Sequence, residues 1–83
     1  MRFTVTSAPG VDDKLAGFWN SASDRQHLTL ASNQIDALLR QAPLSQGIAV
    51  DNYRVLRVGP LAVLYAVSEP NCLVTILDCV YHG

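Results

Sequence analysis

Apolar and polar residues follow their most regular pattern in the C-terminal half of the chain. Three segments rich in β-branched and aromatic residues, 53–58, 61–67 and 73–81, are typical of strands with one buried face. Gly59-Pro60 joins the first two as a two-residue hairpin loop, because glycine accepts the positive φ that such a turn requires. Ser68-Glu-Pro-Asn71 supplies ordinary turn residues before the third segment. The pattern therefore predicts an antiparallel meander of three strands.

The N-terminal half predicts one more strand and two helices. Residues 2–6 alternate in the manner of a strand. Residues 11–19 place apolar side chains on one face of a helix, and residues 23–42 repeat them at helical spacing until a proline ends the pattern. Ser23 and Gln26 have the spacing of a capping box, so the second helix is expected to begin there. Residues 44–52 are interpreted as a loop that becomes a strand.

Together these elements predict an α+β fold of order β-α-α-β-β-β, an antiparallel sheet with an α-hairpin packed on one face. At 83 residues the chain is expected to form one domain, 1–83, with Trp19 and Ile35 as core anchors. Two helices bury only one face of the sheet, so an exposed apolar patch is expected on the other. In the last strand, alternation assigns one face to Val74, Ile76 and Val80 and the other to Leu73, Leu77 and Cys79.

Composition and charge narrow the classes of function. Six basic and seven acidic residues give a net charge of −1 and a pI near 6.0, whereas nucleic-acid-binding proteins usually carry a basic surplus. There is no apolar run of membrane-spanning length and no secretory signal, so a cytoplasmic protein without a membrane partner is expected. Cys72 and Cys79 would lie about 23 Å apart along one strand, which excludes a disulfide between them.

Three features of the N-terminal half are candidates for chemistry. Asp12 and Asp13 suit the first turn of a helix, and the alternative of a metal or acid–base site lacks further ligands nearby. Phe18 and Trp19 suit core packing, and the alternative is a platform on which bases stack. His27 is interpreted as a solvated side chain. Neither a metal nor a cofactor is expected, since no motif for one is present.

The expected hairpin register places Arg54 opposite Tyr65 and Arg57 opposite Ala62. Because side chains alternate along a strand, the two arginines then lie on opposite faces of the sheet. A fixed cation beside a phenol is able to hold a phosphate or a carboxylate of a partner, which makes Arg54, Arg57 and Tyr65 the candidate partner-binding residues. The alternative is an arginine that lies along aromatic surface with its charged end in water.

The same strands carry a resemblance to a known family. The stretch Tyr53-Arg-Val-Leu-Arg-Val-Gly-Pro-Leu-Ala-Val-Leu-Tyr65, followed by a polar turn and Leu-Val-Thr-Ile-Leu77, resembles the C-terminal half of the RelE/ParE family of bacterial toxins. The upstream order of a strand and two helices also matches that family. The resemblance implies a toxin of a type II toxin–antitoxin system, with roles in growth regulation and plasmid stabilization and a cognate antitoxin as its partner.

The ribonuclease members of that family use basic residues on these strands to hold the scissile phosphate, often with a terminal tyrosine or basic residue for proton transfer. Arg54 matches one basic position of the pattern, whereas Leu56 and Ala62 stand where two others are expected. Tyr81 and His82 are the candidates for acid and base. The resemblance therefore implies Arg54, Tyr81 and His82 as the candidate catalytic residues.

The depleted basic set favours a toxin that acts by protein binding, either on a target such as gyrase or only on its antitoxin. A ribosome-dependent mRNA endoribonuclease of the RelE type is the alternative, and a small binding domain without toxicity is a further one. An open sheet face or edge is the expected docking surface. Formation of a homodimer through that surface is the competing outcome.

Overall fold

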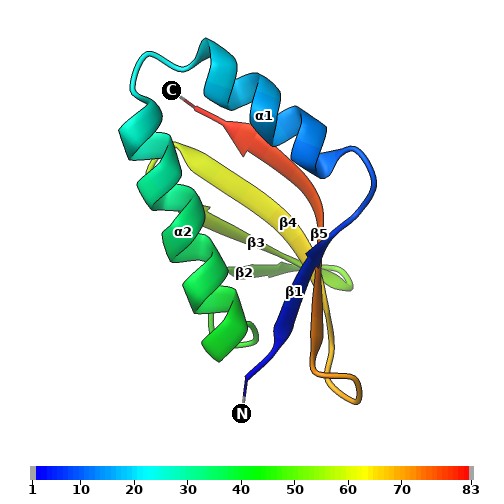
Figure 1. Cartoon of the computed structure of the whole chain (residues 1–83). Helices are drawn as coiled ribbons and strands as arrows, with labels where there is room; N and C mark the ends of the chain where they lie inside the picture. Colours follow the sequence, from blue (N-terminus) through cyan, green and yellow to red (C-terminus); the bar gives the residue numbers. More distant parts are fainter. Residues whose placement is uncertain (1, 83) are drawn as a thin grey trace.

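The computed structural model describes residues 2–82. Two helices lie against one face of a five-stranded sheet with strand order β1-β5-β4-β3-β2 (Figure 1). This arrangement confirms the expected α+β fold. No helix within the described residues is long and apolar enough to cross a membrane. The elements are β1 (Thr4–Ser7), α1 (Val11–Ser21), α2 (Arg25–Gln41), β2 (Ile48–Val50), β3 (Tyr53–Val58), β4 (Leu61–Ser68) and β5 (Leu73–Tyr81).

The sheet differs from the expected antiparallel arrangement in two ways: it contains one additional strand, and one pair of strands is parallel. β1 pairs with β5 in parallel, while the other neighbouring strands are antiparallel. Parallel neighbours need a long connection, and the helices together with the meander supply it. Segment 44–52 contributes β2, which pairs with β3 and forms one edge of the sheet. The expected fold thus gains a short fifth strand.

The β3–β4 hairpin has the register expected from its two-residue loop. Val58 pairs with Leu61, and Arg54 pairs with Tyr65. Gly59 has a φ of 56°, a left-handed value that glycine adopts readily. The turn also lies close to the start of α2, because a Cβ at Gly59 would be 3.2 Å from His27 Nε2. The exposed His27 therefore borders this turn.

A bulge in β5 changes which residues of that strand face the helices. The β4–β5 register steps past one residue, Leu77. Cys79 consequently packs in the core together with Val74, and Val80 faces away from the helices and is 44% exposed. The assignment of Val80 to the face of Val74, and of Cys79 to the opposite face, was therefore wrong. Strict alternation fails wherever an extra residue enters a strand.

The second helix begins at a different cap from the one the sequence predicted. Its N-cap is Asp24, whose Oδ1 accepts a hydrogen bond from the His27 backbone N–H at 2.9 Å. The capping box expected at Ser23 was therefore wrong by one residue, since the aspartate carboxylate takes that role. In α1, Asp12 and Asp13 lie in the first turn as expected, where carboxylates meet unpaired backbone N–H groups.

The core lies between the helices and the sheet, and α2 supplies most of its helical part. Ile35 is only 2% exposed, which confirms it as a core anchor. Val63 and Tyr65 of the sheet are buried and belong to the same core cluster. The buried residues of α2 are Leu28, Ala31, Ile35 and Leu39.

Trp19 lies outside this core, contrary to expectation. Its side chain is 44% exposed, and its Nε1–H donates to Thr29 Oγ1 at 3.2 Å. The Arg25 guanidinium lies 4.8 Å from the centroid of the indole ring. Phe18 is the aromatic residue that packs inward, with its ring centroid 5.9 Å from that of Tyr81. Successive side chains on a helix point about 100° apart, so only one of the two faces the sheet.

An ion pair joins α1 to β5. Lys14 Nζ lies 2.7 Å from Asp78 Oδ1, and the Lys14 hydrogen bond, followed by the Cys79 backbone N–H, lowers the pKa of Asp78. A carboxyl whose folded pKa is below its unfolded value of about 4 stabilises the fold above that pH. The contribution is lost as the pH falls through the folded pKa. We therefore expect Asp78→Asn to lower the Tm by about a degree or two at pH 7 and by less near pH 2.

Thermal unfolding followed by circular dichroism across this pH range measures the effect. Asp51→Asn is the matched control, because it removes a carboxylate from the β2–β3 turn instead. An Asp78→Asn variant whose loss of Tm is the same at pH 2 as at pH 7 would contradict the assignment of the effect to the Lys14 pair.

Candidate functional site

Arg54 and Tyr65 are neighbours on the helix-covered face of the sheet, where the hairpin register predicted them to meet. The Tyr65 hydroxyl lies 2.7 Å from the Pro43 carbonyl oxygen and 3.0 Å from that of Gln46. Arg54 Nε donates to the same Gln46 oxygen at 2.9 Å, and its Nη2 lies 3.4 Å from the Gly47 oxygen. Both side chains therefore hold the loop that connects α2 to β2.

Burial governs the chemistry of this pair. Tyr65 has no exposed surface, and burial raises the pKa of its phenol, although the Arg54 hydrogen bond and charge act in the opposite direction. A phenol with a raised pKa stays protonated at neutral pH and donates its proton to a carbonyl oxygen. Arg54 already donates hydrogen bonds to carbonyl oxygens of the loop, so fewer of its N–H groups are available to bind a phosphate.

We expect Tyr65→Phe to lower the free energy of unfolding by about 1–3 kcal/mol, because it leaves a buried carbonyl oxygen of Pro43 without its donor. Urea denaturation followed by circular dichroism measures the change. Tyr53→Phe is the matched control, since Tyr53 is 44% exposed and its change should stay within about 0.5 kcal/mol. If both variants lose the same free energy of unfolding, the Tyr65 hydroxyl does not stabilise the loop through its hydrogen bond.

Tyr81 and His82 lie toward the opposite end of the sheet from Arg54. Tyr81 pairs with Leu61, which is four residues along β4 from Tyr65, or about 13 Å at 3.3 Å per residue. The structure therefore does not bring the three candidate catalytic residues together. Arg54 contacts the α2–β2 loop, whereas Tyr81 and His82 lie beside the β3–β4 turn.

Other polar residues lie beside the β3–β4 turn. His82 donates its backbone N–H to the Pro60 oxygen at 2.6 Å, and Arg57 Nε donates to the Gly59 oxygen at 3.3 Å. His27 Nε2 approaches the same turn from α2. Arg57 is thus the arginine that shares this end of the sheet with His82, while Arg54 does not.

The face of the sheet opposite the helices is apolar and exposed at its β2 edge. Strand pairing places Ile48 beside Val55 and Val50 beside Tyr53 on this open face. Ile48 is 73% exposed, and Val50, Tyr53 and Val80 are each between 44% and 47% exposed. Both helices lie on the other side of the sheet (Figure 1). The exposed apolar patch expected from the sequence is therefore present, centred on β2 and β3.

The β2 strand is the part of this surface whose bounds the sequence pattern did not predict. Asp51 and Asn52 form a two-residue turn between Val50 and Tyr53, and Asp51 has a φ of 53°. Asparagine and aspartate tolerate that conformation, so an Asp-Asn pair between alternating apolar residues is a hairpin signal. That signal is present in residues 48–55 and would have predicted the strand.

No group of three or more histidine, cysteine, aspartate or glutamate side chains within residues 2–82 is placed to hold a metal ion. Cys72 and Cys79 are not joined by a disulfide. Cys79 is buried, and burial raises the pKa of its thiol, which disfavours the reactive thiolate at neutral pH.

Comparison with known proteins assigns the fold to a class. The sequence matches no family model and no curated protein. The structure is similar to a chain of the toxin–antitoxin complex RelBE2 from Mycobacterium tuberculosis, with a TM-score of 0.76, 16% identity, and coverage of 98% of this chain and 92% of that one. At such identity the similarity establishes the fold alone.

Two further solved structures agree. The archaeal RelE–RelB complex from Pyrococcus horikoshii gives a TM-score of 0.69 at 16% identity, covering 100% of this chain and 98% of that one. The chromosomal ParDE system from P. aeruginosa gives 0.68 at 14% identity, covering 99% and 98%. The protein therefore has a RelE/ParE-like fold over its whole described length, as the sequence resemblance implied.

Proposed function

We propose that this protein is the toxin component of a type II toxin–antitoxin system that acts by protein binding and is neutralised by a cognate antitoxin. The observation that carries the proposal is the RelE/ParE-like fold over 98% or more of the chain, shared with proteins solved as toxin–antitoxin complexes. The expected cytoplasmic location belongs to the same proposal.

The open sheet face supports a protein as the partner. Ile48, Val50 and Tyr53 expose apolar side chains side by side on two paired strands, and β2 ends the sheet with an unprotected edge. A partner is able to add a strand or lay an apolar helix face there. The net charge of −1 supplies no general attraction for nucleic acid. Arg57 lies on the same face and is a candidate contact to a partner's carboxylate.

A bacterial protein such as gyrase is the target we propose, and RNA cleavage on the ribosome is the second candidate. Tyr81, His82 and Arg57 lie at the same end of the sheet, beside the β3–β4 turn, as the second candidate would need. Tyr81 packs on Phe18 on the helix side, however, whereas Arg57 pairs with Ala62 on the open face, so the phenol and the guanidinium do not face one another. Against it, Arg54 is engaged by loop carbonyls, and loss of one group that stabilises developing charge costs about 10²–10³ in rate.

Co-expression with the small protein encoded beside this one tests the proposal. The two proteins should co-purify, and growth should be arrested only when the neighbour is absent. Ile48→Lys should weaken the capture, because it places a charge on the open face at a side chain that is 73% exposed. Leu30→Lys is the matched control, since Leu30 is 58% exposed on α2 and lies away from that face.

A chain that is harmless in cells and captures no neighbouring protein would refute the toxin–antitoxin proposal. Self-association lost in Ile48→Lys would assign the open face to a homodimer instead. RNA incubated with the purified protein, with and without ribosomes, should stay intact. Ribosome-dependent cleavage that disappears in Arg54→Ala would replace protein binding with the endoribonuclease hypothesis.

A further inference from the structure

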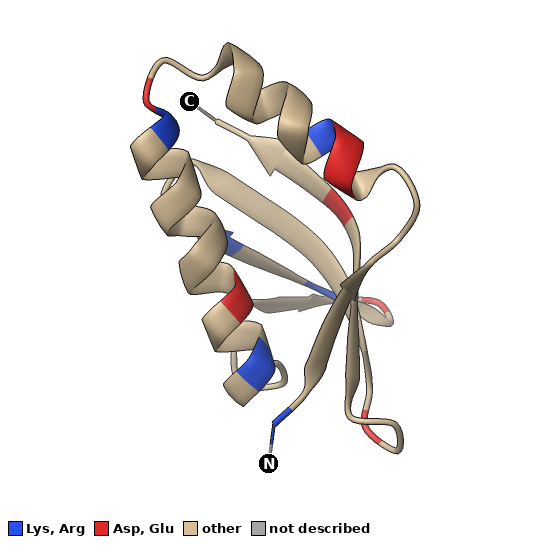
Figure 2. Cartoon of the chain, viewed as in Figure 1, with Lys and Arg blue, Asp and Glu red and all other residues tan. Residues whose placement is uncertain are grey.

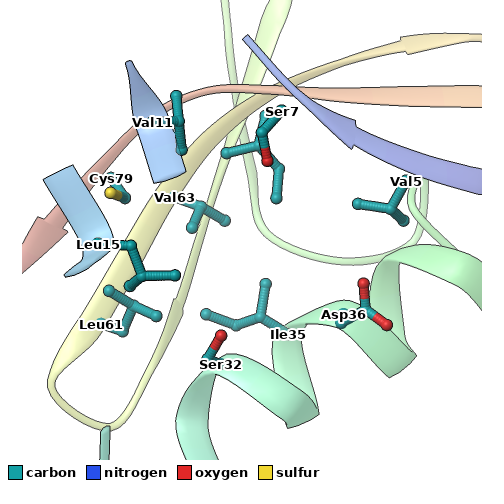
Figure 3. A pocket seen from close by; sticks show the side chains of 11 residues that line it. Val5, Ser7, Val11, Leu15, Ser32, Ile35, Asp36, Leu61, Val63 and Cys79 are labelled. Atoms are coloured by element: carbon teal, nitrogen blue, oxygen red, sulfur yellow. The ribbon is translucent and has the colours of Figure 1, made fainter. Parts of the chain in front are cut away.

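A cavity of about 160 Å³ lies between the two helices and the sheet (Figure 3). It forms because α1 packs on β5 whereas α2 packs on β3, β4 and β1, so the helices diverge and leave part of the covered face between them (Figure 1). Ser7 and Ser32 stand at two of the facing positions, where their short side chains leave space. The apolar part of the wall includes Val5, Val11, Leu15, Ile35, Leu61 and Val63.

The size and chemistry of the wall fit one small apolar group. An apolar protein cavity of about 150 Å³ is large enough to stay dry and to bind benzene. The present cavity has a similar volume and is lined by branched aliphatic side chains from both helices and the sheet. It differs from a sealed void because polar side chains reach it. Figure 3 shows the Ser32 hydroxyl and the Asp36 carboxylate on its α2 side.

Among the described residues that line the cavity, the only charged side chain is a carboxylate, which favours a cation over an anion. Asp36 lines the cavity with a half-exposed side chain, and its ion pair with Arg40 uses one carboxylate oxygen, Oδ2. Near Cys79, at another part of the wall, Lys14 and Asp78 form an ion pair, so that region favours neither sign of charge. Figure 2 shows a basic segment near an acidic segment on each helix, so the preference for a cation rests on the carboxylate in the cavity wall.

We propose that this cavity is a binding site for a small amine with an apolar body of about the size of one benzene ring. The ring lies among Leu15, Ile35 and Val63, and the ammonium group points to the mouth, where Asp36 and the Ser32 hydroxyl accept its hydrogen bonds. The site is on the helix side of the sheet and is separate from the open face that carries the proposed function.

Three probes of similar size and different charge test the proposal on the full chain: benzylamine, toluene and benzoate. Binding is followed by the methyl resonances of leucine, isoleucine and valine in two-dimensional NMR. Saturable shifts should be confined to the residues that line the cavity. Benzylamine should bind about two- to fivefold more tightly than toluene, which is the range of one partly exposed charge pair, and benzoate should bind most weakly.

Two variants separate the shape of the cavity from its charge. Ser32→Leu fills the cavity from a half-buried helical position and should abolish the binding of all three probes, whereas Asn33→Leu on the exposed side of α2 should leave it unchanged. Asp36→Asn should remove the preference for benzylamine, because the unpaired Arg40 then repels a cation. Asp51→Asn should keep the preference.

Absence of saturable shifts with every probe would overturn the site. Shifts that persist in Ser32→Leu would place the binding elsewhere and overturn it as well. Equal affinity for benzylamine and benzoate would overturn the assignment of an amine. None of these outcomes affects the capture of an antitoxin, so failure here is distinguishable from failure of the proposed function.

Discussion

Ile35→Ala is expected to lower the free energy of unfolding by about 2–5 kcal/mol, because it removes buried methyl groups from the centre of the helix–sheet contact. Trp19→Ala is expected to cost about 1 kcal/mol or less, since its ring is 44% exposed and its contacts to Arg25 and Thr29 are at the surface. Urea denaturation followed by far-ultraviolet circular dichroism compares both variants without relying on tryptophan fluorescence.

Leu30→Ala controls for the loss of an aliphatic side chain from α2 at an exposed position, and it should be nearly neutral. A domain of this size has little stability in reserve, so Ile35→Ala is expected to be partly unfolded at 37 °C. If Trp19→Ala proves as damaging as Ile35→Ala, the placement of the indole outside the core is refuted.

Gly47→Ala is expected to cost more than about 2 kcal/mol and to release β2 from the sheet. A Cβ at Gly47 would lie 2.4 Å from the Val55 carbonyl oxygen, and the φ of Gly47 is 70°, which costs a residue with a Cβ about 1–2 kcal/mol. Backbone atoms cannot move aside as a flexible side chain does, so the edge strand must separate from β3. Hydrogen exchange at Ile48 and Val50 should accelerate together with the loss of stability.

Gly17→Ala is the matched control, and its expected effect has the opposite sign. Gly17 lies inside α1, and a Cβ added there would meet no neighbouring atom within 4 Å, so alanine gains helix propensity of about 0.5–1 kcal/mol at no steric cost. Destabilisation by Gly17→Ala, or normal exchange protection of β2 in Gly47→Ala, would contradict the geometry of these two positions.

The parts of the fold that follow from local rules were predictable from the sequence. A two-residue loop at Gly59-Pro60 leaves one register for β3 and β4, and Arg54 pairs with Tyr65 as that register requires. The bulge at Leu77 was not predictable from the sequence. Apolar residues occur on both faces of β5, so the pattern of apolar and polar residues does not reveal where an extra residue enters the strand. The choice between Phe18 and Trp19 also depended on where α1 docks, which adjacent aromatic residues do not specify.

In the candidate site, too, local pairing was predictable from the sequence, whereas contacts that depend on distant segments were not. The sequence placed Arg54 next to Tyr65 but gave no indication of what their polar groups contact. Those contacts depend on the path of the α2–β2 loop, which turns at Gly47 and brings the Gln46 carbonyl to both side chains. The separation of Arg54 from Tyr81 likewise follows from strand pairing over long sequence distances.

The parallel pairing of β1 with β5 has a consequence for how the protein folds. Thr4 pairs with Leu73, so almost the whole described chain separates these partners, and the contact order of the sheet is raised. Because short loops close at a lower entropic cost, we expect the hairpins of the meander to form before β1 pairs with its distant partner. A nascent chain on the ribosome therefore carries β1 and both helices without the strand that completes their docking surface. Assembly of the mixed sheet must await synthesis of β5.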